Sequence, residues 1–428
     1  MIERLLAAIR SADVRQGVAL WAAMILAGGF DYAVNVLAGR WLVPVEYGIF
    51  ISISAILQVL TYLAIAIRNV AAFYTAELSN QEDSANRVGA FVWRAWSWAW
   101  QWGLAATALM MVASPVLMRL LRLPNPWPIW AAAPALLLMF VRAVTDGSLQ
   151  GIRAFPGFGV VQVVQALVRL LFAAGLIYFG FRAAGAIFAL PLAMAMALLS
   201  GLWFLRPLFQ RPKGPVARWV SWHYSTYTLL GLAAFAVLAN MDALFVKHAF
   251  SPRAAGDYAP VVTLARMSQF VPLAIGILLL PKVKQYQAKG ESARGLLFLS
   301  LGGALAPGLG LSLLYFLFPG PLVRIVFTGA YANPGVVLGL ASLAATLFAG
   351  LNIWLNYSLA LERPAFVYAL VALLFGQAVG MSMLGRGNLV RVTLVMVSMG
   401  ALGNIVGFFA TRNMAAADKS VEAQTVGV

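Results

Sequence analysis

The sequence predicts an all-α, polytopic membrane protein with about 12 transmembrane helices in two six-helix lobes. Three observations predict this fold class: the composition, the recurrence of long apolar runs, and a likeness between the two halves of the chain. Of the 428 residues, 62% are hydrophobic and only 10% are charged, whereas a soluble domain carries about 25% charged residues. Apolar runs of about 18 residues or more recur along the chain, and each can cross the hydrocarbon core of a bilayer.

The apolar runs define the spans and leave only short segments outside them. In the first half the expected spans are 17–39, 48–70, 93–117, 127–150, 156–180 and 183–205, and in the second half 225–247, 258–281, 294–318, 335–358, 364–384 and 391–411. Lobes at 17–205 and 225–411 are therefore expected, joined by a basic cytoplasmic linker at 206–224. In residues 1–16, Ile2, Leu5, Leu6 and Ile9 share one helical face away from Arg4 and Arg10, which predicts an interfacial helix, with a frayed terminus as the alternative. Residues 412–428 are expected to be a cytoplasmic tail.

The distribution of basic residues predicts the orientation. With both termini inside, the inner segments hold 19 of the 30 Lys and Arg residues and the outer segments hold 9. This imbalance predicts that the N- and C-termini lie in the cytoplasm. It also accounts for most of the net charge of +16, so the charge does not indicate binding to nucleic acid.

Composition also limits the chemistry. The chain has no cysteine and only two histidines, which excludes disulfides and thiolate sites and argues against a zinc centre. It contains no paired carboxylates at catalytic spacing, no nucleophile motif and no phosphate-binding glycine loop. The sequence therefore predicts neither an enzyme nor a resident metal.

The two halves resemble each other where a long helix ends. Span one ends in "FDYAVNVLAGRWLVPVEYGIF" and span seven in "LANMDALFVKHAFSPRAAGDYAPV". Each stretch has an intramembrane Asp, a basic residue at the outer end, a Pro in the turn, and then Gly and Tyr, although the spacing differs by about three residues. Two lobes related by a pseudo-two-fold axis are typical of transporters that rock around a central site.

Polar residues inside the spans follow helical stripes. Gln162, Gln165 and Arg169 lie at i, i+3 and i+7, which places them on one face of span five. Asp31 and Asn35 lie at i and i+4 in span one. Such amides either line a cavity or join helices by hydrogen bonds.

Several charged residues have two interpretations. Arg142 lies four residues before Asp146, so the two either line a cavity or form a self-satisfied pair near the inner headgroups. Lys247 either faces the cavity or extends to the outer interface. Arg68 and Arg153 are expected at headgroup level.

Four ionisable residues lie too deep for these explanations, namely Asp31, Arg169, Asp242 and Arg266. Intramembrane charges face a bundle interior or a water-filled cavity, so we expect these four to face a hydrated vestibule between the halves, where Asp242 and Arg266 can also neutralise each other. Basic groups at or near membrane depth outnumber acidic ones: Arg68, Arg142, Arg169, Lys247 and Arg266 against Asp31, Asp146 and Asp242. A net-positive cavity favours an anionic cargo, and Arg is suited to binding phosphate.

Four stretches in this order resemble the polysaccharide and lipid-linked oligosaccharide flippases (Wzx-like) of the multidrug/oligosaccharidyl-lipid/polysaccharide (MOP) exporter superfamily. They are "LAGRWLVPVEYGIF" at 37–50, "GSLQGIRAFPGFGVVQVVQALVRLLF" at 147–172, "NMDALFVKHAFSPRAAGDYAPVVTLARM" at 240–267 and "PLVRIVFTGAYANP" at 321–334.

This resemblance implies a MATE-like fold that moves a polyprenyl-pyrophosphate glycolipid, such as an O-antigen or exopolysaccharide repeat unit, across a bacterial or archaeal cell membrane by alternating access. It implies a cationic cavity lined by Arg169, Arg266, Lys247, Arg142, Gln165 and Asn35. Asp31 and Asp242 would hold the lobes together by salt bridges or couple transport to H⁺ or Na⁺. The resemblance implies no other cofactor, a monomer among membrane lipids, and polysaccharide assembly proteins as partners.

Other readings remain open. A multidrug exporter of the same superfamily is the main alternative, although cationic drugs would favour an acidic cavity. A major-facilitator sugar transporter shares the six-plus-six layout but has a Gly- and Arg-rich loop that 77–92 lacks. A membrane glycosyltransferase or polymerase would need a long external loop with catalytic residues. Lipid II flippases usually have about fourteen spans, two more than expected here.

Overall fold

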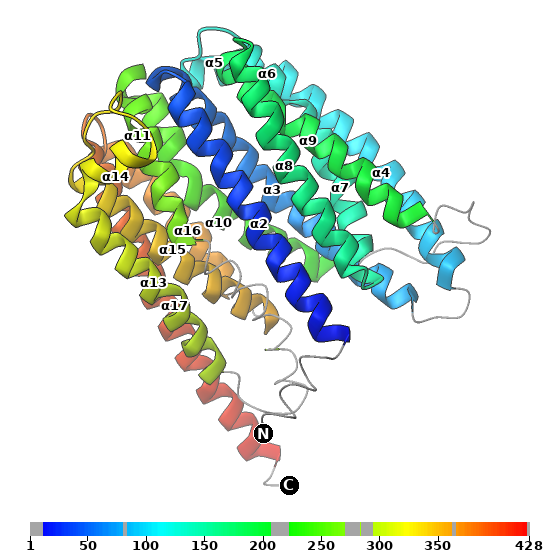
Figure 1. Cartoon of the computed structure of the whole chain (residues 1–428). Coiled ribbons are helices and arrows are strands. Elements are labelled where there is room, and N and C mark those ends of the chain that lie inside the picture. Colours follow the sequence, from blue (N-terminus) through cyan, green and yellow to red (C-terminus); the bar gives the residue numbers. More distant parts are fainter. Residues whose placement is uncertain are drawn as a thin grey trace. The chain divides into compact units, whose positions relative to one another are not determined.

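The computed structural model describes residues 12–79, 84–206, 222–269, 283, 294–361 and 365–425. Within these ranges every regular element is a helix, which confirms the all-α prediction (Figure 1). Residues 1–11 of the predicted interfacial helix lie outside the described residues, and so do residues 207–221 of the predicted linker.

The chain divides into two compact units, Met1–Val220 and Ser221–Val428. The division falls inside the segment predicted as a linker. Unit 1 contains α2 (Ala12–Trp41), α3 (Pro44–Ser79), α4 (Ser84–Val112), α5 (Ser114–Leu121), α6 (Trp127–Ala132), α7 (Pro134–Gly151), α8 (Phe155–Tyr178) and α9 (Arg182–Leu205).

Unit 2 repeats the pattern of long apolar helices. It contains α10 (Trp222–Ala249), α11 (Pro252–Ala265), the 3₁₀ turn η2 (Arg266–Gln269), α13 (Arg294–Leu317), α14 (Pro319–Val326), α15 (Val336–Ala360), α16 (Ala365–Leu384) and α17 (Leu389–Thr425). The last helix continues beyond the predicted end of span twelve, so the backbone of the predicted tail is helical as far as Thr425.

Ten helices in the described part of the chain are long and apolar enough to cross a membrane, or eleven when α4 and α5 count as one bent span. The bend between α4 and α5 is 55° and follows from Pro115 in the first turn of α5, because Pro cannot continue a hydrogen-bonded helix. Predicted span 93–117 runs across this bend, so the apolar run is not one straight helix. Only residues 258–269 of predicted span 258–281 are among the described residues.

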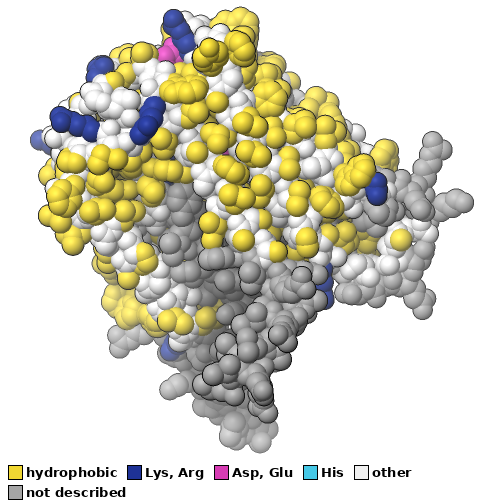
Figure 2. Space-filling view, viewed as in Figure 1, with side chains coloured by type: hydrophobic (Ala, Val, Ile, Leu, Met, Phe, Trp, Pro, Cys, Tyr) yellow, Lys and Arg dark blue, Asp and Glu magenta, His cyan; other side chains and the backbone are white. Residues whose placement is uncertain are grey.

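Hydrophobic side chains dominate the described surface that Figure 2 shows, with Lys and Arg towards its edges. On α4 alone, Trp93, Trp98 and Trp102 are exposed. A soluble protein rarely exposes apolar surface on this scale, whereas lipid solvates it. The chain is a multi-pass membrane protein.

Helix α7 packs closely against α3 because two glycines face that helix. A Cβ atom at Gly147 would collide with the backbone oxygen of Arg68, and a Cβ atom at Gly151 would lie 2.6 Å from the Cβ of Thr75. Glycines at this four-residue interval let helix backbones approach closely in membranes. The approach fixes where the polar residues of α3 and α7 lie relative to each other.

The likeness between the halves extends to the structure of each unit. In both units a third long helix is followed by an eight-residue helix that begins with Pro in its first turn, α5 in unit 1 and α14 in unit 2. The interval from Asp31 to Tyr47 equals that from Asp242 to Tyr258, 16 residues in each case. The difference of about three residues noted in the sequence is therefore the place of the turn, because α2 ends 10 residues after Asp31 and α10 ends 7 residues after Asp242.

Candidate functional site

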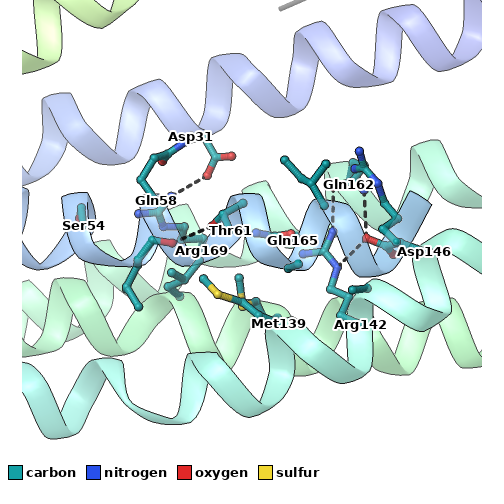
Figure 3. Close-up of a pocket in the computed structure, with 17 residues that line it drawn as sticks. Asp31, Ser54, Gln58, Thr61, Met139, Arg142, Asp146, Gln162, Gln165 and Arg169 are labelled. Atoms are coloured by element: carbon teal, nitrogen blue, oxygen red, sulfur yellow. Dashed lines mark hydrogen bonds and ion pairs between the residues drawn. The ribbon is translucent and has the colours of Figure 1, made fainter. Parts of the chain in front are cut away.

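Unit 1 contains a polar cavity of about 300 Å³ among α2, α3, α7, α8 and α9. Figure 3 shows polar side chains from four of these helices pointing into it. Its polar and charged lining residues are Asp31, Ser54, Gln58, Thr61, Arg68, Arg142, Asp146, Gln162, Gln165 and Arg169. Three arginines and two aspartates leave this lining with an excess of one positive charge.

One end of the cavity holds an ion pair between α2 and α8. Arg169 Nη1 donates to Asp31 Oδ1 at 2.9 Å, across 138 residues of sequence. The Asp31 side chain is 42% exposed and that of Arg169 is 15% exposed. The Nε of Arg169 is buried and has no hydrogen-bond partner among the described residues, so this N–H group could donate to a bound anion.

The other end holds a buried cluster of Arg142, Asp146 and Gln162. Arg142 Nε lies 3.2 Å from Asp146 Oδ2, and both side chains are 8% exposed. Arg142 Nη2 donates to Gln162 Oε1 at 2.7 Å, and Gln162 Nε2 lies 3.4 Å from Asp146 Oδ2. Arg142 and Asp146 therefore form an i,i+4 ion pair that also lines the cavity.

Arg68 joins this end of the cavity from α3. Its Nε atom is buried without a hydrogen-bond partner in the described part of the chain. The expectation of a headgroup position for Arg68 rested on a span ending near residue 70, whereas α3 continues to Ser79. The missed signal was the stripe of Gln58, Thr61 and Arg68 at i, i+3 and i+10, which share one face of the helix.

Four of the predicted site residues thus line one cavity: Asp31, Arg142, Gln165 and Arg169. The others lie elsewhere. Asn35 donates its amide to the backbone oxygen of Asp31, 2.9 Å away, one turn earlier in its own helix. Asp242, Lys247 and Arg266 belong to unit 2 and are not part of the lining of this cavity.

In unit 2, Asp242 and Arg266 each bond to a neighbouring polar side chain. Asp242 is buried, and so is Lys247. Tyr258 donates its hydroxyl to Asp242 Oδ2 at 2.9 Å, and Arg266 Nη2 donates to Asn240 Oδ1 at 2.7 Å. The sequence predicted that Asp242 and Arg266 could neutralise each other, but it did not single out Tyr258 or Asn240 as partners.

The described residues contain no group of three or more His, Cys, Asp and Glu side chains that could hold a metal ion. The polar residues that line the cavity of unit 1 are instead three arginines, three glutamines, two aspartates, a serine and a threonine. Guanidinium groups bind phosphate oxygens through paired, charge-assisted hydrogen bonds.

No protein-family model matches this chain, and no curated protein matches it in sequence. Solved structures do match over nearly the whole chain. An inward-facing multidrug resistance MATE family transporter of the MOP superfamily aligns with a TM-score of 0.69 at 12% identity, covering 90% of this chain and 96% of that one. The lipid II flippase MurJ, in an inward closed conformation, aligns with a TM-score of 0.69 at 11% identity, covering 93% and 87%.

The chain has the MOP-superfamily transporter fold. A third MOP structure, a transporter from Pyrococcus furiosus described as having a binding pocket of reverse polarity, aligns with a TM-score of 0.51 at 12% identity, covering 93% and 94%. The predicted MATE-like architecture is therefore confirmed. Identities this low establish the fold, so the cargo has to be argued from the site.

Proposed function

We propose that this protein is a transporter that moves a polyprenyl-pyrophosphate-linked oligosaccharide from the inner to the outer leaflet by alternating access. The observation that supports it best is the polar cavity of unit 1, in which Arg68, Arg142 and Arg169 face two aspartates. Spare guanidinium donors inside a membrane protein fit an anionic group, and the pyrophosphate is the anionic part of such a cargo.

The size of the cavity supports a role in binding only the pyrophosphate part of the cargo. About 300 Å³ is at the lower limit of small-molecule sites, which suits a pyrophosphate with little more than one adjoining sugar. In this proposal the lipid tail stays in the bilayer and most of the glycan lies outside the cavity. The cavity would then bind the group that all such lipid-linked cargoes share, and the identity of the sugars would matter less.

The unit 2 residues have separate proposed roles. Arg266, already bound to Asn240, and the buried Lys247 would contact the cargo at a later stage of the cycle, and Asn35 would contact it from α2. Asp31 and Asp242 would link transport to H⁺ or Na⁺ or stabilise one state through salt bridges. The protein would act as a monomer in a bacterial or archaeal cell membrane, with both termini inside, and pass its cargo to polysaccharide assembly proteins.

A MATE-type, cation-coupled multidrug exporter is the alternative. It is favoured by the shared fold and by Asp31, whose half-exposed carboxylate lies in the cavity lining. A cationic drug would approach Asp31 only against the repulsion of three arginines, whereas an anion is attracted to them. A membrane glycosyltransferase is a weaker alternative, because the site offers positioning groups and no evident nucleophile.

The first experiment reconstitutes the full chain in liposomes with a pyrophosphate-linked oligosaccharide and measures how fast the glycan becomes accessible to an external lectin. Arg142→Ala and Arg169→Ala should each slow this exposure about tenfold or more, since a hydrogen bond to a charged group contributes roughly 1.5–3 kcal/mol. Arg266→Ala tests the unit 2 role in the same assay. Arg324→Ala is the matched control, because it removes an exposed arginine of α14 and should leave the rate unchanged.

The result that contradicts the proposal is equally concrete. If folded wild-type protein exposes no pyrophosphate-linked glycan but the same vesicles transport an organic cation, the chain is a multidrug exporter. If Arg324→Ala slows exposure as much as Arg142→Ala, general surface charge explains the effect and the cavity does not.

A further inference from the structure

The carboxylate of Asp146 is held unusually loosely for a buried charge. Its Oδ1 atom has no hydrogen-bond partner among the described residues. Its Oδ2 atom lies 3.2 Å from Arg142 Nε, which itself makes no well-aligned hydrogen bond, and 3.4 Å from Gln162 Nε2. The second distance exceeds the usual range of about 2.7–3.2 Å for such bonds. Buried carboxylates with a purely structural role are normally better bonded than this.

The position of Asp146 is nevertheless electrostatically specific. It shares the lining of the cavity with Arg142 on its own helix and with Arg68 on α3, while Gln162 of α8 contacts both Arg142 and Asp146. The remaining charged lining groups are Asp31 and Arg169, and these two pair with each other. Asp146 is therefore the carboxylate that compensates Arg68 and Arg142 when the cavity contains no anion.

We propose that Asp146 is an internal counter-ion, which the anionic group of the cargo displaces from Arg142 and Arg68. The proposal rests on the function proposed above and identifies the residue that limits how tightly the site binds a diphosphate. The Arg142 guanidinium can exchange Asp146 Oδ2 for an oxygen of the anion without moving far, because Gln162 keeps its Nη2 in place.

The physical reason for such a residue lies in the empty half of the transport cycle. A carrier that has released its cargo must return with an empty site, and uncompensated buried charges are costly in that state. A carboxylate within the site removes much of this cost. It also weakens cargo binding, since the anion must compete with it, and weaker binding favours release at the outer leaflet.

Asp31 offers the natural comparison within the same cavity. It pairs with Arg169 as Asp146 pairs with Arg142, but its side chain is 42% exposed, against 8% for Asp146. Solvent screens the exposed pair more strongly. Neutralising Asp31 should therefore change anion affinity much less than neutralising Asp146.

The test measures binding of inorganic pyrophosphate to the purified full chain in nanodiscs by titration calorimetry. Asp146→Asn keeps the shape and removes the charge, and we expect it to bind pyrophosphate about tenfold more tightly than wild type. Asp146→Glu, which restores the carboxylate, should return close to wild-type affinity, and Asp31→Asn should gain less affinity than Asp146→Asn. Asp257→Asn is the control, because it neutralises the i,i+4 pair Arg253–Asp257, which is not part of the lining of this cavity, and it should bind pyrophosphate as wild type does. Asp146→Ser is measured in parallel as a second neutral variant, so that poor folding of Asp146→Asn does not decide the outcome.

A second readout separates a counter-ion from a structural residue. In the lectin assay, the neutral variants should expose the first cargo normally but slow down in later turnovers, because the empty carrier returns slowly. Loss of a structural residue would instead weaken binding and slow every turnover.

The outcomes are distinguishable from failure of the proposed function. If wild type binds pyrophosphate and the folded neutral variants bind it equally or more weakly, the counter-ion role of Asp146 is wrong while the anion site stands. If neither wild type nor the neutral variants bind pyrophosphate, the anion site itself is wrong, and the inference about Asp146 falls with it.

Discussion

Tyr258 and Asp242 form a buried pair in which the phenol donates to the carboxylate at 2.9 Å. The other carboxylate oxygen, Oδ1, has no hydrogen-bond partner among the described residues. Tyr258→Phe removes the donor while keeping the ring, so it should leave a buried carboxylate under-satisfied. We expect it to lower the free energy of unfolding by about 1–3 kcal/mol, measured as earlier thermal unfolding in detergent. Tyr178→Phe is the control, because Tyr178 is 80% exposed.

An unfolding temperature for Tyr258→Phe that matches that of Tyr178→Phe would contradict this account. It would mean that the hydroxyl contributes nothing and that the remaining surroundings of Asp242 satisfy its charge.

The spacings within single helices singled out Arg142, Gln165, Arg169 and Asp31, and all four line one cavity. Their role in binding a cargo stays a prediction. Arg68 lines the same cavity, and its spacing did not single it out as a site residue. The pairing of Arg169 with Asp31 spans 138 residues, so helical periodicity could not show that these two side chains meet.

At the scale of elements, the close contact of α7 with α3 carries a prediction. A methyl group at Gly147 would meet the backbone of α3, at the oxygen of Arg68 and 3.0 Å from the amide nitrogen of Ala72. Backbone atoms cannot rotate away, so Gly147→Ala should separate the helices and lower the unfolding free energy by about 1–3 kcal/mol. It should also weaken pyrophosphate binding, because Arg68 and Asp146 would move apart.

Gly175→Ala is the matched control in α8, where nothing lies within 4 Å of the added carbon. It should be neutral or slightly stabilising, since Ala favours a helix more than Gly does. Equal stability of the Gly147→Ala and Gly175→Ala proteins would show that α3 and α7 can separate without cost.

The helices themselves were largely predictable, because a membrane leaves few alternatives for an apolar run of this length. Their breaks were less so. The bend between α4 and α5 follows from one Pro. The residues on both sides of the bend are apolar, and a run of apolar residues does not indicate where a helix axis changes direction. Likewise, α3 and α17 extend beyond their apolar parts, where helix propensity and packing decide the end.

At the scale of the whole molecule, the orientation is testable with a convenient property of the chain: it has no cysteine. Single cysteines can therefore be placed without background. Arg386→Cys, in the segment between α16 and α17, should react with an impermeant maleimide added to intact cells. Arg153→Cys, between α7 and α8, should react only after the membrane is permeabilised. The reverse pattern would invert the predicted orientation.

Composition and the two-halves pattern were enough to predict the class of fold, because both are properties of long stretches. The candidate site was only partly predictable, since it is assembled from five helices whose packing depends on details such as Gly147 and Gly151. The sequence indicated an excess of positive charge. The structure adds that in unit 1 each aspartate of the cavity lies beside an arginine.

The equal interval between Asp31 and Tyr47 and between Asp242 and Tyr258 also bears on ancestry. An interval that is the same in both units is what duplication of one ancestral segment predicts. The aspartate is now paired with Arg169 in unit 1 and with Tyr258 in unit 2. On this hypothesis the two units began with the same acid, and its different partners are a later divergence.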